Sequence, residues 1–273
     1  MSLNYINLGC GSHFHPDWVN LDYAKTSKNV IAHNLNKGIP FPDNTFEVVY
    51  HSHVLEHFSQ KNAVHFMEEC YRVLKNNGII RIAIPDLEQI INEYKKQLEK
   101  AKNGEEQADL NYQWIMMELF DQTVRNQSGG EMAKFLCQEN LQNEAFILQR
   151  IGSEAKRTID LCSNHQMRQG NKAKPKLKYT STIKCYAKNV LRLILGEKLL
   201  NYILIGRFRE SGEIHQWMYD QYSISLLLKQ CGFHNISLKT AYESDIPEFS
   251  KYNLDVVNGG IRKPDSLFVE AYK

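Results

Sequence analysis

The stretch YINLGCGSHFHPDWVNLDY, residues 5–23, decides the fold of this chain. A short β-rich run ends in a Gly-Cys-Gly turn at residues 9–11, and a second run from Val19 ends at Asp22. Glycines directly after a strand let the backbone turn tightly and come close to a ligand. In open α/β sheets ligands lie beyond the carboxyl ends of the strands, so this turn is the first candidate for a binding site.

The same stretch excludes a dinucleotide as the ligand. A dinucleotide site needs a third glycine, a full helix whose N-terminus receives the pyrophosphate, and an acidic residue about 20 positions on. Phe14 stands where the third glycine would be, Asp22 follows too soon, and Pro16 shortens any helix between them. A nucleoside ligand without phosphates fits better, because the Asp22 carboxylate can accept hydrogen bonds from both ribose hydroxyls.

Strands and helices alternate through the first 86 residues. Further strands are predicted at Val30–Ala32, at Phe46–Tyr50 and in IIRIAIPD, which begins at residue 79. Between the last two, apolar residues at helical spacing predict a helix that ends at Gly78. This rhythm is typical of a doubly wound α/β sheet.

A mostly helical insertion interrupts this pattern after the fifth strand. Helices are predicted from Leu87 to about 104, from about 108 to 125 and from 131 to 151. The α/β pattern returns with a helix closed by Gly232 and two alternating segments, NISLKT and SLFVEAY. We therefore expect residues 1–86 and 212–273 to form one α/β core, with 87–211 as the insertion.

Composition narrows the functional classes. The 273 residues carry 33 basic and 31 acidic side chains, so global charge indicates no nucleic-acid or acidic partner. The six cysteines show neither a zinc-binding spacing nor a disulfide framework. Reduced thiols, no recognisable export signal and no spanning apolar run lead us to expect a cytoplasmic protein.

Five separated segments occur in the order typical of one enzyme family: INLGCG, VNLD, IPFPDNTFEVVYHSHVLEHF, ECYRVLKNNGIIRIAIPD and LLKQCGF. Together they resemble the class I, Rossmann-like S-adenosylmethionine-dependent methyltransferases, in particular the type 11 group. The resemblance covers roughly residues 4–90 and 212–273. It implies a seven-stranded sheet with one antiparallel edge strand, and S-adenosyl-L-methionine lying across the ends of the first strands.

The resemblance also assigns cofactor contacts. It places the glycine turn on the methionine part, Asp22 on the ribose, the segment after the third strand on the adenine, and the end of the fourth strand near the sulfonium. The insertion would cover the acceptor side as a lid. The cofactor-binding residues expected in this way are Gly9, Cys10, Gly11, Asp22, Asn34, Leu35, His51, Ser52 and His53.

Methyl transfer to a hydroxyl gains from a general base, and histidine suits that role. His215 is the preferred candidate, because it lies where the chain returns to the core, with Trp217 and Tyr219 expected to wall the cleft. His53 and His57 are further candidates, although His53 suits a place beside the cofactor and His57 a solvated helix turn. Glu56 lies between them, in reach of orienting one. The His53–His57 pair lacks the following Glu and third ligand of a known metal motif, so no metal is expected.

The expected activity is O-methylation of a sugar or another small-molecule hydroxyl. The alternative is a non-catalytic S-adenosylmethionine-binding scaffold or regulatory protein, which predicts a cleft filled by the insertion. Nine basic residues between Arg168 and Lys198, followed by the apolar LLNYILIGRF, suggest weak peripheral membrane contact through 168–208. The interpretation we favour is a solvated loop at 170–178 and a helix buried against the lid or a second subunit of a homodimer, because Arg192, Glu197 and Asn201 do not gather on one polar face.

Overall fold

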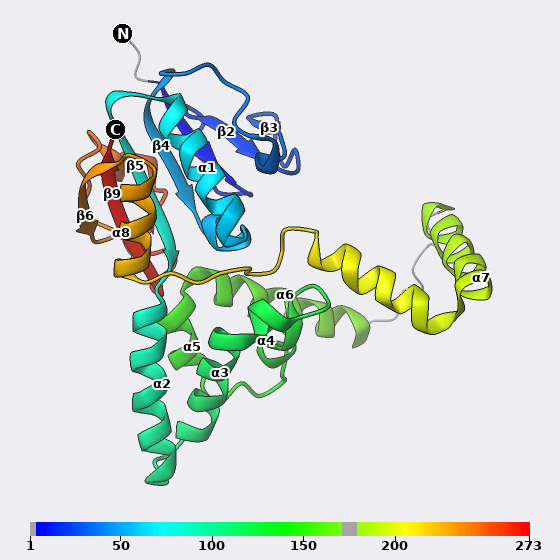
Figure 1. Cartoon of the computed structure of the whole chain (residues 1–273). Coiled ribbons are helices and arrows are strands. Elements are labelled where there is room, and N and C mark those ends of the chain that lie inside the picture. The colour runs from blue at the N-terminus through cyan, green and yellow to red at the C-terminus, as the bar shows by residue number, and fades with distance from the viewer. Residues whose placement is uncertain (1–3, 171–178) are drawn as a thin grey trace.

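The computed structural model describes residues 4–170 and 179–273, with side chains for 4–163 and 192–273. Its core is a seven-stranded sheet in the order β3-β2-β1-β4-β5-β9-β6 (Figure 1). Six strands run in one direction, and β9 is antiparallel to both its neighbours. The strands are β1 (Tyr5–Leu8), β2 (Val19–Asp22), β3 (Val30–Ala32), β4 (Phe46–Ser52), β5 (Leu74–Pro85), β6 (His234–Lys239) and β9 (Ser266–Tyr272).

This sheet confirms the expected α/β fold with one antiparallel strand. That strand is β9, which stands one place in from the edge, between β5 and β6. A two-stranded ribbon, β7 (Val256–Val257) and β8 (Gly260–Ile261), precedes it in the chain.

Helices α1 (Gln60–Val73) and α8 (Gln221–Gln230) pack on one face of the sheet. The α1 residues that face the strands are Ala63, Phe66, Met67, Cys70 and Val73, at the helical spacing of an apolar stripe. Both helices begin at side-chain caps, Ser59 for α1 and Asp220 for α8.

The expected helix stop at Gly78 is wrong. Helix α1 ends at Val73, and Leu74 is already extended and paired with Phe46 of β4. Gly78 lies inside β5, where a Cβ would come within 2.8 Å of the Lys75 carbonyl oxygen. Pairing with β4 outweighs the local helical pattern here, as tertiary context often does.

The other face of the sheet is covered by loops and the short 3-10 helix η3 (Phe249–Tyr252). The Trp18 ring contacts Tyr50, Phe249 and Tyr252 edge-on, and Tyr50 contacts Phe249 at a tilt, with ring centroids 5.1–6.3 Å apart. This aromatic cluster fixes residues 246–254 against β1 and β4.

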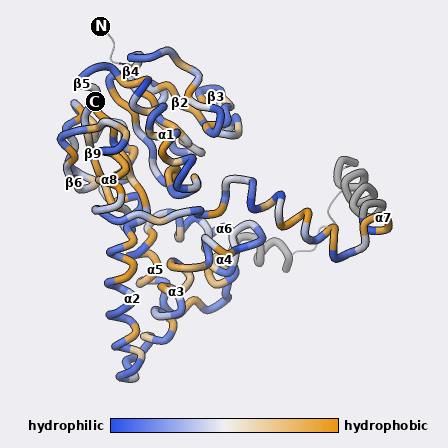
Figure 2. The backbone as a smooth tube through the Cα atoms, in the orientation of Figure 1, coloured by the Kyte–Doolittle hydropathy of each residue, from blue (hydrophilic) through white to orange (hydrophobic). Residues whose placement is uncertain are grey.

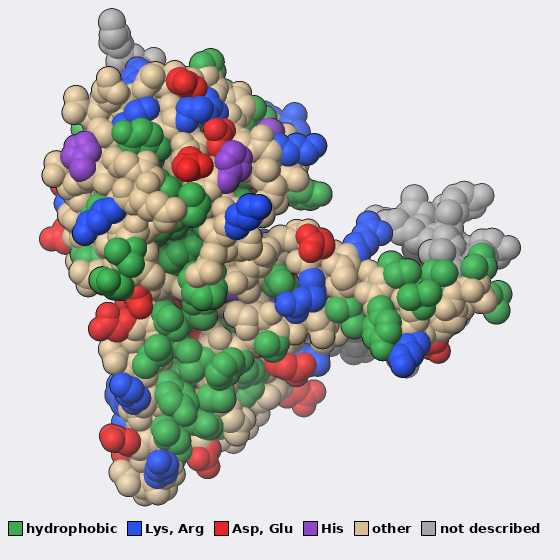
Figure 3. Space-filling model, in the orientation of Figure 1, with side chains coloured by type: hydrophobic (Ala, Val, Ile, Leu, Met, Phe, Trp, Pro, Cys, Tyr) green, Lys and Arg blue, Asp and Glu red, His purple; other side chains and the backbone are tan. Residues whose placement is uncertain are grey.

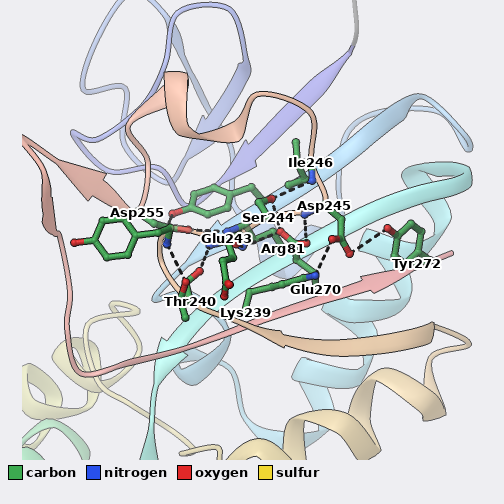
Figure 4. Close-up of polar contacts among 12 residues, drawn as sticks. Arg81, Lys239, Thr240, Glu243, Ser244, Asp245, Ile246, Asp255, Glu270 and Tyr272 are labelled. Atoms are coloured by element: carbon green, nitrogen blue, oxygen red, sulfur yellow. Dashed lines mark hydrogen bonds and ion pairs between the residues drawn. The ribbon is translucent and has the colours of Figure 1, made fainter.

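A buried ion network holds the C-terminal loop to the sheet (Figure 4). The guanidinium of Arg81, in β5, lies 2.7 Å from Asp255 and 2.7 Å from Glu270 of β9. It also donates to the carbonyl oxygens of Glu243 and Thr240. The Tyr50 hydroxyl donates to Asp255 over 2.6 Å. Every group in this network has a partner, so the network holds the loop that leads to residue 262 against the sheet.

The described chain between β5 and residue 209 is mostly helical: α2 (Leu87–Lys102), α3 (Ala108–Val124), α4 (Gly130–Leu136), α5 (Glu144–Ile151), α6 (Ser153–Gly170) and α7 (Tyr179–Arg209). Trp114, Ile115, Phe135 and Ile147 form a separate apolar core among these helices. Hydrophobic and hydrophilic segments alternate along the helices (Figure 2). Helix α7 extends away from the others (Figure 1).

Two expectations about this region are wrong. The single helix predicted at 131–151 is two helices, because the chain leaves helical geometry between α4 and α5. Cys137 and Cys162 form a disulfide with Cα atoms 5.3 Å apart, so not all thiols are reduced. The two cysteines are 25 positions apart, and the helix packing that joins them is invisible to spacing rules. Cys185 and the basic residues at 168–191 fall outside the described side chains.

None of the described helices is long and apolar enough to cross a bilayer.

Candidate functional site

The carboxyl ends of β1 and β4 open onto a cavity of about 320 Å³. Its floor is the glycine turn and the end of β4, and its far wall comes from α6 and from the loop before β9. The lining includes Gly9, Cys10, Gly11, His13, Tyr50, Ser52, His53, Arg157, Arg262 and Lys263. Five of the nine expected cofactor residues therefore meet at one cavity.

The structure favours glycine at positions 9 and 11 of the turn for different reasons. Both have positive φ, +65° at Gly9 and +57° at Gly11, which disfavours other residues. A Cβ on Gly9 would approach Val54 to 2.3 Å, so the turn packs directly on the chain after β4. A Cβ on Gly11 would meet nothing within 4 Å, which leaves open space above the turn. This is the cradle that a ligand approaching the backbone requires.

Asp22 lies beside this cradle without lining it. Its carboxylate accepts the backbone N–H of Gly11 at 2.7 Å and that of Ala24 at 3.1 Å. A carboxylate has about four acceptor positions, so the two bonds leave capacity for further donors. The bond to Gly11 ties Asp22 to the rim of the cavity.

Three expected cofactor residues lie elsewhere. Asn34 caps the short helix η1 (Leu35–Lys37) by accepting from the Asn36 N–H, and Leu35 packs on the core. His51 is fully buried against Phe66, and burial lowers its pKa to about 3. Neither ring nitrogen of His51 has a hydrogen bond within the described residues. The structure brings none of the three to the cavity.

A second cavity of about 540 Å³ lies between the core and the insertion. His53, Glu154 and Lys263 line both cavities, so the two adjoin at these side chains. Core residues of the second cavity include Glu56, His57 and Asp265. The insertion and the segment after it supply Gln122, Arg125, Met132, Leu136, Thr158, Glu213 and His215. Trp217 and Tyr219, expected to wall the cleft, do not line it.

The three expected catalytic histidines come together in this second cavity. His53 has a left-handed φ of +55°, a strained conformation for a histidine, at the point where β4 ends. Its Nδ1 lies 3.3 Å from Glu56 Oε1, and its Nε2 lies 2.8 Å from the Ser266 hydroxyl. The rings of His57 and His215 meet edge-on, with centroids 4.9 Å apart.

Glu56 is at the centre of the cluster. The short 3-10 helix η2 (Leu55–His57) places it, and its carbonyl accepts from Gln216 and Trp217, which ties the returning chain to the core. Its Oε1 is 4.0 Å from His215 Nε2. His57 Nδ1 is 3.0 Å from the Ile214 carbonyl oxygen, so Nδ1 carries the proton and Nε2 keeps its lone pair.

Burial sets the charge states in this cluster. Desolvation raises the pKa of Glu56 to about 8 and lowers the pKa of His53 and His215 well below the usual histidine value. Desolvation also lowers the pKa of His57 and raises that of Asp265 to about 7. Within the described residues, both Glu56 oxygens, His215 Nδ1 and Asp265 Oδ1 make no hydrogen bond. Such groups are costly when buried alone, which indicates a site built for a ligand.

Sequence reasoning missed many of the lining residues, among them the charged side chains of Arg157, Arg262, Lys263 and Asp265. The Arg-Lys pair just before the last strand was a usable signal, because it follows a turn at the ligand-binding edge of the sheet. Nothing near Arg157 in the sequence links it to the glycine turn. In the structure its guanidinium lies 3.4 Å from the Ser12 hydroxyl.

Comparison with known proteins gives the following matches. Residues 7–82 match the family model described as "Methyltransferase domain". An S-adenosylmethionine-dependent methyltransferase from Archaeoglobus fulgidus aligns over 99% of this chain and 86% of its own, with 11% identity and a TM-score of 0.39. A methyltransferase from Thermotoga maritima, described as a possible histamine N-methyltransferase, aligns over 99% and 82%, with 10% identity and a TM-score of 0.39. The search of curated proteins gives no match.

Proposed function

We propose that this chain, an S-adenosylmethionine-dependent methyltransferase of the class I, Rossmann-like type, methylates a hydroxyl group of a sugar or another small molecule. One observation carries the proposal: the cavity at the glycine turn and the polar cavity under the insertion adjoin at His53. The first suits the methyl donor and the second an acceptor rich in hydroxyl groups.

The donor side is assigned as follows. When bound, S-adenosylmethionine supplies an electrophilic methyl group on a sulfonium. Gly9, Cys10 and Gly11 line its methionine part, and Asp22 accepts from the ribose hydroxyls. Arg157 and Arg262 face the same cavity and have no carboxylate partner among the described side chains, so they receive the methionine carboxylate. Ser52, whose hydroxyl accepts from Arg262 at 2.6 Å, holds that guanidinium in place.

The acceptor side holds the hydroxyl in line with the methyl group and removes its proton. Positioning at near-attack distance supplies much of the rate. His215 is the proposed base, since it is neutral, buried and on the acceptor side of His53. His53 lies between the two cavities. His57 orients His215 through the edge-on contact of their rings.

The alternative, a non-catalytic scaffold, predicts that insertion side chains fill the cleft. The insertion instead lines a cavity of about 540 Å³, which favours an enzyme.

The experiment is a methyl-transfer assay with the purified chain, radiolabelled S-adenosylmethionine and panels of sugars, amines and carboxylic acids. Label transfer to a hydroxyl, mapped by mass spectrometry, supports the proposal. Transfer to amines alone, or tight donor binding without transfer to any panel, contradicts it. Calorimetric titration with NAD serves as the control, with no binding expected.

The predictions about binding partners and cellular location do not depend on the proposed reaction. Helix α7 exposes Leu193, Ile194, Leu199, Tyr202, Ile203 and Leu204, and hydrophobic side chains gather on this arm (Figure 3). Membrane contact through this arm, or pairing with a second copy, would cover them. Sedimentation with anionic vesicles and light scattering separate the two. A cytoplasmic location is likewise a prediction, and the Cys137–Cys162 disulfide is the observation against it.

A further inference from the structure

Glu56, His57 and His215 offer one ligand atom each, and these three atoms lie within 4.8 Å of one another. Two histidines and one carboxylate are a ligand set that binds divalent transition metals and leaves coordination positions open. Sequence spacing does not reveal this set, because His215 lies far along the chain from Glu56 and His57. The third ligand, His215, comes from the segment just after the insertion.

The hydrogen bonds around these three side chains leave lone pairs available for a cation. His57 donates from Nδ1 to the Ile214 carbonyl, which leaves the Nε2 lone pair available. A second-shell carbonyl of this kind is what normally fixes the tautomer of a metal-bound histidine. Glu56 is fully buried, and neither carboxylate oxygen makes a hydrogen bond within the described residues. The backbone N–H of His215 donates to the Gln122 carbonyl over 2.9 Å, which holds this residue beside Glu56.

Nearby positive charges are already neutralised. Lys263 Nζ lies 2.9 Å from Glu154, and Arg125 lies 3.8 Å from Asp121 and 3.4 Å from Glu213. Glu56 has the imidazole nitrogens of His53 and His215 at 3.3 and 4.0 Å but makes no hydrogen bond among the described residues, so the cost of its burial is poorly compensated. A bound cation removes this cost.

We propose that Glu56, His57 and His215 bind one divalent transition metal ion, of the zinc, manganese or iron type, at the wall of the acceptor cavity. The open positions of the ion face the 540 Å³ cavity, where an acceptor hydroxyl can bind. Its role rests on the proposed function: the ion lowers the pKa of the bound hydroxyl, whose proton passes to His53. With the ion bound, His215 serves as its ligand, so in this inference His53 replaces His215 as the general base named in the proposed function.

The test uses the full chain after treatment with a chelator and dialysis. Titration with Co²⁺, followed by calorimetry and visible absorption, is expected to show one equivalent bound with the absorption bands of a nitrogen- and oxygen-ligated ion. Neither methyl donor nor acceptor is present. A wrong acceptor class would therefore leave this result unchanged, and the two failures are distinguishable.

Variants locate the ion. His215→Ala and the nearly isosteric Glu56→Gln are each expected to weaken Co²⁺ binding at least tenfold, with far-ultraviolet circular dichroism confirming the fold. The matched control is His65→Ala, an exposed histidine of α1, which is expected to bind as the wild type does. No stoichiometric Co²⁺ binding by the wild type would overturn the proposal. So would an equal loss in His65→Ala, or unchanged binding in both site variants.

Discussion

Two clusters of ionisable side chains are buried in this molecule, and they differ in how many of their polar atoms have hydrogen-bond partners. Around Arg81, two carboxylates, a tyrosine hydroxyl and two carbonyl oxygens satisfy one another (Figure 4). Around Glu56, both carboxylate oxygens lack hydrogen bonds within the described chain, and so do His215 Nδ1 and Asp265 Oδ1. We infer that equal burial serves different purposes: the first cluster holds the fold together, and the second is the proposed ligand site.

The largest effect is expected from Arg81→Met. The change leaves Asp255 and Glu270 buried without a counter-charge, so the free energy of unfolding should fall by about 3–5 kcal/mol. Urea denaturation measures it. Lys251→Met is the control, because this exposed lysine pairs with the exposed Glu248 and lies over the Tyr252 ring, and it should leave the free energy of unfolding close to the wild-type value. A loss below about 1 kcal/mol for Arg81→Met would show that the satisfied cluster is not structural.

His215→Ala should have the opposite effect, with a large loss of activity and little loss of stability. Turnover of the hydroxyl acceptor should fall by about 10²–10⁴-fold, while donor affinity stays at the wild-type value. The thermal midpoint should change little, because His215 Nδ1 makes no hydrogen bond that the alanine would lose. Steady-state kinetics and calorimetry with S-adenosylmethionine measure the two quantities. Full activity in this variant would remove the cluster from catalysis.

Asp22 is intermediate between the two clusters, since two backbone donors satisfy part of its carboxylate. Asp22→Ala should weaken S-adenosylmethionine binding by about 1.5–3 kcal/mol, the range for hydrogen bonds to a charged group. Asp17→Ala, an exposed carboxylate in the same loop, should bind as the wild type does. Unchanged affinity in Asp22→Ala, measured by calorimetry, would contradict the ribose assignment.

Asp265 predicts a pH dependence of stability. Burial raises its pKa to about 7, with Glu118 and Glu154 adding to the rise and Lys263 and Arg150 opposing it. The folded protein therefore keeps a proton that the unfolded chain loses near pH 4, and this contribution to stability is lost as pH rises through about 7.

Asp265→Asn cannot ionise and should flatten this decline, which is at most about 1.4 kcal/mol per pH unit for one proton. Urea denaturation at several values between pH 4 and 8 compares the slopes. Identical slopes in the variant and the wild type would mean that Asp265 does not hold this proton.

The smallest effect is expected from Arg157→Gln, since this guanidinium is exposed. Affinity for S-adenosylmethionine should fall by about two- to fivefold, the value of an exposed ion pair. Affinity for 5′-methylthioadenosine, which lacks the carboxylate, should not change. Lys156→Gln on the same helix is the control and should leave both affinities unaltered. Equal losses for both ligands would show that Arg157 does not receive the carboxylate.

The sequence predicted what local patterns control. The glycine turn, the strand runs and the order of the core elements follow from glycine conformation and apolar periodicity, and the structure confirms them. Cys10, Gly11, Ser52 and His53 meet at one cavity because the carboxyl ends of neighbouring parallel strands share one edge.

The remaining site residues are brought together by packing between segments that are distant in sequence, which local patterns do not predict. Arg157 reaches the glycine turn only because α6 folds back over it, and His215 meets Glu56 only because the chain after α7 pairs with η2. The sequence alone indicates only an orienting role for Glu56, since its lack of hydrogen-bond partners depends on the packing around it. The disulfide and the misplaced end of α1 have the same origin, in contacts between segments distant in sequence.

The position of β9 in the sheet has a consequence for how the chain folds during its synthesis. Within the sheet, β6 pairs only with β9, which itself occupies the slot beside β5. On a ribosome, the first five strands and α1 can assemble while later residues are still being added, but β6 must wait for residues 266–272 to emerge. Nascent chains stalled before that point should expose an unpaired edge of β5, where chaperones would engage them.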